Sequence, residues 1–111
     1  MTLDEYQEKA MRTAMDFEQE EDALSYAAMA VAGEAGEYMN IVKKQVYHGH
    51  EAGLEAKLAM IDELGDILWG VAFAAEVLGV PLSVIAQSNI AKLEKRYPDG
   101  FDPERSRNRN L

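Results

Sequence analysis

The sequence predicts an all-α fold with four helices, and three observations support this prediction. Apolar residues recur at steps of three and four along most of the chain, which is the period of an α-helix. No segment shows the strict alternation of apolar and polar side chains that is typical of a half-buried strand. The three prolines stand at positions 81, 98 and 103, so proline interrupts nothing before position 81.

The first two helices follow from local start signals and from one apolar stripe. Thr2 followed by Glu5 resembles a capping box, which predicts a helix from there to about Phe17. The acidic run at 18–22 is expected to be a solvated connection. Helix two is predicted over residues 23–47. Its apolar stripe consists of Leu24, Ala28, Val31, Ala35, Tyr38, Val42 and Val46.

The last two helices are separated by a glycine and a proline. The His-Gly-His sequence at 48–50 should break helix two, and helix three is predicted over residues 54–78. Its second half is apolar on all sides, which indicates a central helix or one at a subunit interface. Gly79 is expected to end it. Pro81 is suited to the first turn of helix four, which should end near Arg96.

The length of 111 residues predicts a single domain, at residues 1–97, followed by a polar, arginine-rich tail at 98–111. Pro98, Asp99 and Gly100 form a turn motif, and the rest of the tail is expected to be extended or partly disordered.

Composition narrows the classes of function. A net charge of −9 argues against a nucleic-acid polymer as partner, although divalent cations can still join an acidic protein to a phosphate substrate. The absence of cysteine excludes thiolate zinc sites and a thiol nucleophile, and it suits the cytoplasm. The longest apolar stretch, 67–78, contains Glu76 and is shorter than the ~20 residues of a membrane span, so no membrane association is expected.

Two pairs of acidic residues are the most informative feature. Glu34 and Glu37 in helix two, and Glu63 and Asp66 in helix three, are each three residues apart and therefore share a helix face. If the two helices pack together, four carboxylates converge, and such a group is stable only with cations or with some carboxyls protonated. Oxygen ligands of this kind favour Mg²⁺, for which Mn²⁺ can substitute.

A single Glu-x-x-Glu pair is more often a solvated helix face than a metal site. Here both pairs lie in apolar helices and both are flanked by glycine, at Gly33, Gly36 and Gly65. Glycine inside a helix costs about 1 kcal/mol relative to alanine. These three are therefore expected to mark a close approach of backbones or a bulky ligand.

A second group of polar residues lies on helix four. Asn89, Lys92 and Arg96 share one face and suit phosphate oxygens, although an ordinary polar outer face would look the same. Lys43 and Lys44, near the end of helix two, face either phosphates or water.

Trp69 follows the second acid pair by three residues and is a candidate contact for the substrate. Trp69 and Phe73 are one helical turn apart, however, and such a pair more often belongs to the core.

In this order, the motifs resemble a known family. They are Gly33-Glu-Ala-Gly-Glu37, Lys43-Lys44, Glu63-Leu-Gly-Asp-Ile-Leu-Trp69, Asn89-Ile-Ala-Lys-Leu93 and Arg96-Tyr-Pro-Asp-Gly-Phe101. The chain is similar to the MazG-like nucleotide pyrophosphohydrolases of the all-α NTP pyrophosphatase superfamily. The resemblance implies cleavage of nucleoside triphosphates, including deoxynucleotides, between the α and β phosphates, in the control or house-cleaning of nucleotide pools.

The resemblance also implies roles for particular residues. The magnesium ligands would be Glu34, Glu37, Glu63 and Asp66. The phosphate contacts would be Lys44, Asn89, Lys92 and Arg96. Either Glu37 or Glu63 could also serve as general base. The four-helix bundle would be completed by oligomerisation, as a homodimer or a homotetramer with active sites near subunit interfaces.

Two other classes of protein fit parts of the pattern. In a non-catalytic helical interaction protein, the acid pairs would be solvent-exposed side chains without a role in catalysis. A di-metal carboxylate bundle for oxidation or metal storage would bind iron, but the Glu-x-x-His step of such bundles is missing.

Overall fold

The computed structural model describes residues 1–47 and 53–108. Its regular structure is helical, and no β-strand forms within these two ranges, which confirms the all-α class. The expected break at 48–50 lies outside the described residues. The elements are α1 (Leu3–Ala10), the 3-10 helix η1 (Met11–Thr13), α2 (Glu20–Tyr47), α3 (Leu54–Leu78), α4 (Leu82–Arg96) and α5 (Pro103–Arg107).

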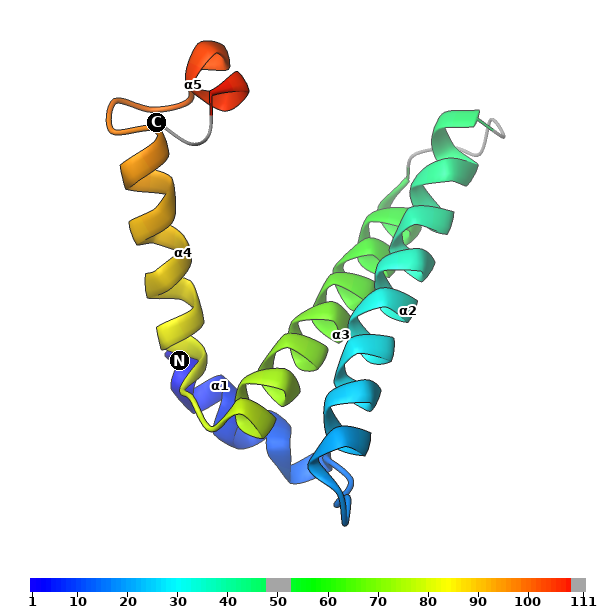
Figure 1. Cartoon of the computed structure of the whole chain (residues 1–111). Coiled ribbons are helices and arrows are strands. Elements are labelled where there is room, and N and C mark those ends of the chain that lie inside the picture. Colours follow the sequence, from blue (N-terminus) through cyan, green and yellow to red (C-terminus); the bar gives the residue numbers. More distant parts are fainter. Residues whose placement is uncertain (48–52, 109–111) are drawn as a thin grey trace.

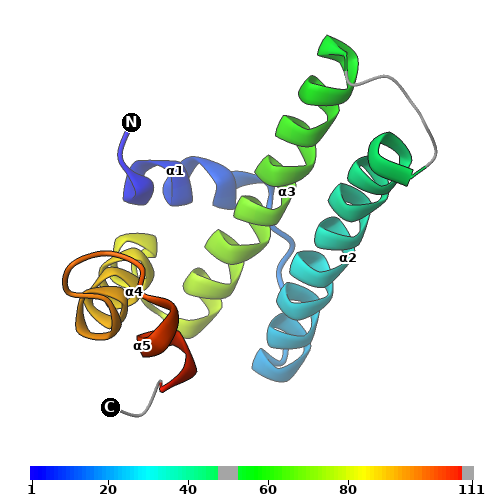
Figure 2. The ribbon, with the colours of Figure 1, turned by 90° about the horizontal axis from the view of Figure 1, so that it is seen from above.

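Helices α2 and α3 form an antiparallel pair, and α4 leaves them in another direction, so the chain is V-shaped (Figure 1). Seen from above, α1 lies across α3 on the side away from α2 (Figure 2). The bend between α3 and α4 is 102°. Of the helices in the described part of the chain, none is by itself long and apolar enough to cross a membrane; only α3 and α4 taken together pass that test.

An aromatic cluster joins the start of α2 to the middle of α3. Trp69 and Phe73 are stacked with ring centroids 5.5 Å apart, and Tyr26 meets Phe73 edge-on at 5.6 Å. The buried side chains of Ala23 and Ala27 pack against the same cluster. Such aromatic pairs add stability beyond the area they bury. The cluster therefore fixes the end of the α2–α3 pair at which α1 also packs.

The first helix is shorter than predicted, because the carbonyl of Ala10 accepts from the side chains of Thr13 and Trp69 instead of from the backbone N–H that would continue the helix. The indole Nε1 of Trp69 donates to the carbonyl of Ala10 at 3.2 Å and to Thr13 Oγ1 at 2.9 Å. In a longer helix, the Ala10 carbonyl would instead accept from the N–H of Ala14, which here donates to Met11. The prediction of a helix up to Phe17 was therefore wrong.

Three further differences lie at helix ends. Residues 20–22 form the first turn of α2 and not a connection, since acidic side chains stabilise a helix N-terminus. Pro81 is the N-cap of α4, one residue before its first turn. The tail contains the short helix α5 because Asp102 caps it and Pro103 is suited to its first position. The other predicted ends, at Leu78 and Arg96, are confirmed.

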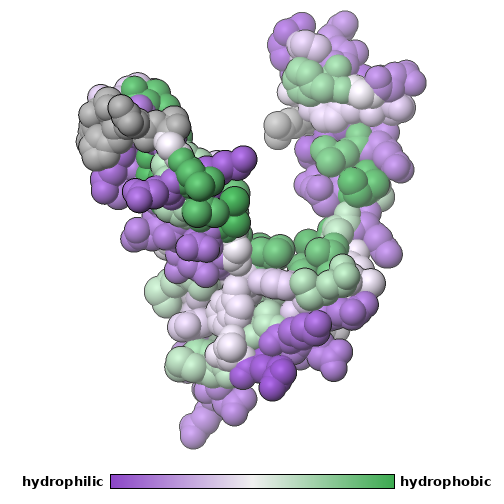
Figure 3. All heavy atoms as spheres, turned by 180° about the vertical axis from the view of Figure 1, so that it is seen from behind, coloured by the Kyte–Doolittle hydropathy of each residue, from purple (hydrophilic) through white to green (hydrophobic). Residues whose placement is uncertain are grey.

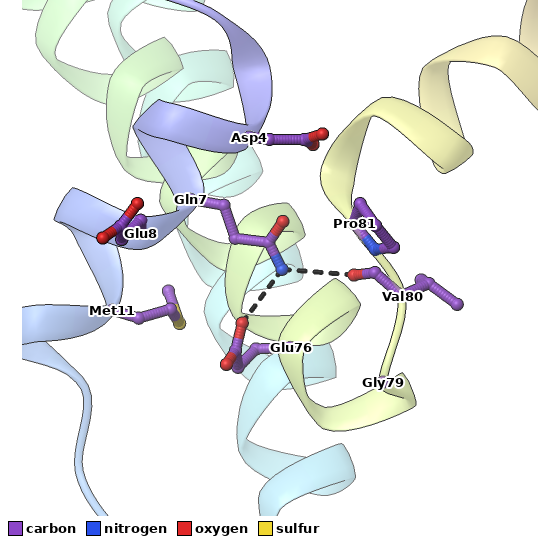
Figure 4. A pocket seen from close by; sticks show the side chains of 8 residues that line it. All are labelled: Asp4, Gln7, Glu8, Met11, Glu76, Gly79, Val80 and Pro81. Atoms are coloured by element: carbon purple, nitrogen blue, oxygen red, sulfur yellow. Dashed lines mark hydrogen bonds between the residues drawn. The ribbon is translucent and has the colours of Figure 1, made fainter.

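Helix α1 holds the α3–α4 junction through the buried side chain of Gln7. Its Nε2 donates to Glu76 Oε2 at 3.0 Å and to the Val80 carbonyl at 3.2 Å (Figure 4). Its Oε1 accepts from the N–H of Leu82 at 2.6 Å. Asp4 accepts from the N–H and the hydroxyl of Ser83. Since Pro81 offers no side-chain cap, α1 supplies the acceptors that the first turn of α4 needs.

A cavity of about 550 Å³ opens beside this junction (Figure 4). Three of the residues that line it are acidic, namely Asp4, Glu8 and Glu76. Two of these carboxylates, Glu76 and Asp4, already accept hydrogen bonds from Gln7 and Ser83. They therefore have a structural role at the α3–α4 junction.

Candidate metal centre

The α2–α3 pair brings acidic residues from both helices together. Glu34 lies on α2, and Glu63 and Asp66 lie one turn apart on α3. One carboxylate oxygen from each of the three lies within 4.8 Å of the others. Glu34 and Glu63 are half-buried, and Asp66 is exposed. The group therefore sits at the edge of the helix pair, where one side is open to a ligand.

Glu63 is the most perturbed member of this group. The pKa of Glu63 is raised to about 7, first because its protonated form can hydrogen-bond to Glu34 and then because the carboxyl is desolvated. The negative charges of Glu34, Asp66 and Glu37 raise that pKa further. The Oε2 atom of Glu63 is buried and has no hydrogen-bond partner among the described residues. A buried oxygen without a partner is costly unless it binds a proton or a cation.

These residues fit a magnesium ion. The donors are carboxylate oxygens, which Mg²⁺ and Mn²⁺ prefer, and three negative charges converge where a divalent cation would balance them. The buried Oε2 of Glu63 is an acceptor that such a cation would satisfy. The chemistry of the group thus agrees with the cofactor predicted from the sequence.

The raised pKa of Glu63 predicts how stability depends on pH in metal-free protein. Because this pKa is above that of an unfolded glutamate, the folded state binds the proton more tightly. The stabilisation should be complete below about pH 4.5 and should be lost as the pH rises through about 7. The free energy of unfolding, measured with urea in EDTA, should therefore fall across this pH range in the wild type. The Glu63→Gln variant should lack this part of the pH dependence. Identical pH profiles for the two proteins would contradict the assigned pKa.

The other predicted site residues lie at varying distances from this group. Glu37 is exposed on α2, one turn beyond Glu34, and its negative charge is near enough to raise the pKa of Glu63. Lys44 is exposed near the end of α2. Trp69 belongs to the aromatic cluster, and its N–H is already bonded to α1. Its predicted contact with the substrate stays a prediction.

The predicted phosphate contacts of α4 stand on the other arm of the V (Figure 1). Asn89 and Lys92 are exposed, and Arg96 is half-buried. The carbonyl of Arg96 accepts a hydrogen bond from Arg105 Nε at 2.6 Å, which ties α5 to the end of α4. Within the single chain, therefore, the arm with these residues diverges from the arm with the acidic group.

One residue next to the acidic group was not singled out from the sequence. Tyr6 of α1 is half-buried, and its pKa is raised by burial and by the negative charge of Asp66. The negative charge of the group therefore acts on its hydroxyl. A tyrosine in the first helix gives no local signal of this, because the packing of α1 on α3 is a tertiary feature.

A comparison with known families decides which of the predicted classes applies. The model of the MazG nucleotide pyrophosphohydrolase domain matches residues 22–101, which include both acid pairs and helix α4. The chain belongs to the MazG nucleotide pyrophosphohydrolase family. Family membership indicates a hydrolase that acts on nucleotides, and it is consistent with divalent-metal dependence.

A relative of this MazG protein is the Gene 37 protein of Mycobacterium phage L5. The two are 40% identical over 81 residues, which cover 71% of this chain and 70% of the phage protein. The name of the phage protein states no activity. Among solved structures there is no significant match.

Proposed function

We propose that this MazG protein is a Mg²⁺-dependent hydrolase that cleaves nucleoside triphosphates, deoxynucleotides included, between the α and β phosphates. The products would be a nucleoside monophosphate and pyrophosphate. The observation that carries the proposal is the convergence of Glu34, Glu63 and Asp66 in a chain of this family. Glu37, one turn from Glu34, would be the fourth ligand, and Mn²⁺ would be able to replace Mg²⁺.

Each part of the group would have a separate task. The carboxylates would hold the cation, which when bound neutralises phosphate charge and lowers the pKa of a water molecule. A carboxylate that is free to accept a proton would act as general base, and Glu37 and Glu63 are the two candidates. The water oxygen would form a bond to the α phosphorus while the bond from that phosphorus to the bridging oxygen breaks, and pyrophosphate would leave.

Cationic side chains would hold the phosphates of the substrate. Lys44 extends from α2, the helix that carries Glu34, and Asn89, Lys92 and Arg96 extend from α4. A cation placed near the leaving pyrophosphate stabilises charge that grows during the reaction. Because α4 diverges from the α2–α3 pair within the protomer, we propose that a second copy of the chain brings α4 to the acidic group (Figure 1).

The exposed apolar surface supports such an assembly. The protomer is hollowed between its two arms, and apolar side chains gather on the floor of the hollow and along both arms (Figure 3). Large apolar side chains on α3 alone are between 38% and 71% exposed. They are Leu54, Leu58, Ile61, Leu64, Leu68 and Leu78. A surface of this kind is typical of a subunit interface.

We therefore expect a homodimer or a homotetramer in solution. Light scattering coupled to size-exclusion chromatography would measure the mass. Replacing Leu58 and Ile61 together by aspartate should shift the protein toward the monomer, since both would bury a charge at the interface. A monomeric wild-type protein at micromolar concentration would contradict this prediction.

The identity of the products tests the proposed bond cleavage. With a triphosphate and Mg²⁺, anion-exchange chromatography should resolve monophosphate and pyrophosphate in equal amounts, and a panel of canonical and modified nucleotides would show the preference for base and sugar. In water labelled with ¹⁸O, the label should enter the monophosphate, because the α phosphorus is attacked. Release of diphosphate and orthophosphate would show that another phosphorus is attacked.

A further inference from the structure

Helices α2 and α3 approach each other closely at a glycine that the metal site does not include. Gly70 is buried in α3. A Cβ atom at this position would lie 2.9 Å from Cγ2 of Val31, 3.2 Å from the backbone nitrogen of Val31 and 3.5 Å from its Cα. Two carbon atoms pack best at about 3.5–4.0 Å. The present separation of the helices therefore depends on the absence of a side chain at position 70.

This contact lies next to the acidic group on both helices. Val31 precedes Glu34 by three residues, which is about one turn. On α3, Gly70 follows Asp66 by four residues and therefore shares its side of the helix. Because the helices are antiparallel (Figure 2), the contact and the carboxylates occupy adjacent turns of the same interface.

The other helical glycines near the acid pairs do not have this role. A Cβ atom at Gly33, Gly36 or Gly65 would meet nothing within 4 Å. The expectation that these three mark a close approach of backbones is thus wrong within the protomer, and the alternative of a bulky ligand stays a prediction. The close approach belongs to Gly70, which stands in the apolar second half of α3.

We propose that Gly70 is a positioning residue, which sets the distance between the carboxylate of α2 and those of α3. This inference rests on the proposed metal-dependent function. Glu34 can join Glu63 and Asp66 only if α2 lies close to α3, and Mg²⁺ demands near-ideal ligand geometry at about 2.0–2.1 Å. A shift of α2 by a few tenths of an ångström should therefore weaken metal binding without unfolding the helices.

The side chain of Val31 cannot move away from a side chain that is added at position 70. A β-branched residue in a helix has one strongly preferred rotamer, so its Cγ2 atom cannot turn away at low cost. The second contact, at 3.2 Å, is to backbone nitrogen and moves only with α2 itself. In Gly70→Ala, the helix pair must therefore separate or rotate at the turn next to Glu34.

The experiment measures Mn²⁺ affinity by electron paramagnetic resonance, at a temperature well below the unfolding transition of each variant. Gly70→Ala is expected to weaken Mn²⁺ binding about tenfold or more, as loss of support around a metal ligand usually does. The double variant Val31→Ala/Gly70→Ala should regain part of the affinity, because the Cγ2 contact at 2.9 Å is gone while the backbone contact at 3.2 Å remains. Val31→Ile, which enlarges the side chain that faces Gly70, should weaken binding in the same direction.

Two controls separate positioning from a general loss of stability. Gly65→Ala lies on the same helix with open space around the new methyl group and should bind Mn²⁺ as the wild type does. Phe73→Leu should lower the unfolding temperature through the aromatic cluster but leave the Mn²⁺ affinity of the folded protein unchanged.

The outcomes distinguish this inference from the proposed function. If the wild type binds Mn²⁺ in a manner that requires Glu63, and folded Gly70→Ala binds it equally well, the positioning role is wrong while the metal site stands. If the wild type does not bind Mn²⁺, both are wrong. Should Gly70→Ala fail to fold, Val31→Ile decides the question by the same criterion, and unchanged affinity in that variant overturns the inference.

Discussion

Replacing Glu63 by glutamine should reduce Mg²⁺-dependent turnover by at least about 10²–10³-fold while the helical circular dichroism is retained. Glu63 stands in the acidic group with Glu34 and Asp66, and its buried Oε2 has no hydrogen-bond partner among the described residues. Glutamine keeps the shape of the side chain but loses the charge that would bind the cation. Initial rates of pyrophosphate release at saturating Mg²⁺ would measure the loss.

The same substitution should not weaken the metal-free fold. Glutamine resembles the protonated form of Glu63, and its amide can still donate a hydrogen bond to Glu34. It also removes a negative charge from a crowded group, so stability in EDTA at pH 8 should be equal to or higher than that of the wild type. Loss of activity together with retained stability would separate a ligand from a structural residue.

Two further variants control this experiment. Asp62 adjoins Glu63 in sequence but does not belong to the group of converging carboxylates, so Asp62→Asn should remain active. Glu37→Gln should be inactive if Glu37 is the fourth ligand or the general base. Unchanged turnover in both Glu37→Gln and Glu63→Gln would contradict the assigned metal site.

Sequence signals at the end of a helix itself predicted well where that helix ends. The C-terminal end of α3 follows from Gly79, which has a φ of +72° and ends the helix in the left-handed conformation that glycine allows. The end of α1 could not be predicted in this way. It is set in part by the indole of Trp69, which is distant in sequence and takes the carbonyl of Ala10. Local helix propensity cannot predict a contact between residues so far apart in sequence.

In the candidate site too, some features follow from local sequence spacing and others depend on tertiary packing. The spacing of Glu63 and Asp66 places both on one face of α3, and the packing of α2 brings Glu34 to them. The proximity of Tyr6 to Asp66, and the close approach at Gly70, depend on how three helices pack. The approach of α4 to the acidic group depends on the proposed second copy of the chain, which signals within one helix do not reveal. This is why a test of its residues has the greatest value.

Lys92→Ala is expected to lower kcat/KM by about 10²-fold, which is the usual loss when one well-placed group that stabilises charge is removed. Lys92 is exposed on α4, on the same face as Asn89 and Arg96. If it contacts the leaving pyrophosphate, it stabilises the transition state more than the bound substrate. Its loss should then lower kcat and not only raise KM. Steady-state kinetics with one triphosphate at saturating Mg²⁺ would measure both constants.

Comparison with other lysines makes this result specific. Lys9 and Lys57 are exposed on α1 and α3, and their alanine variants should have near-normal kinetics. Lys92→Arg keeps the positive charge and should retain more activity than Lys92→Ala. Mn²⁺ affinity without nucleotide should not change in Lys92→Ala, since Lys92 is not a ligand. If Lys92→Ala behaves like the Lys9 and Lys57 variants, this face of α4 is an ordinary solvated surface. The cationic contacts of the substrate must then come from Lys43, Lys44 or the arginines of the tail.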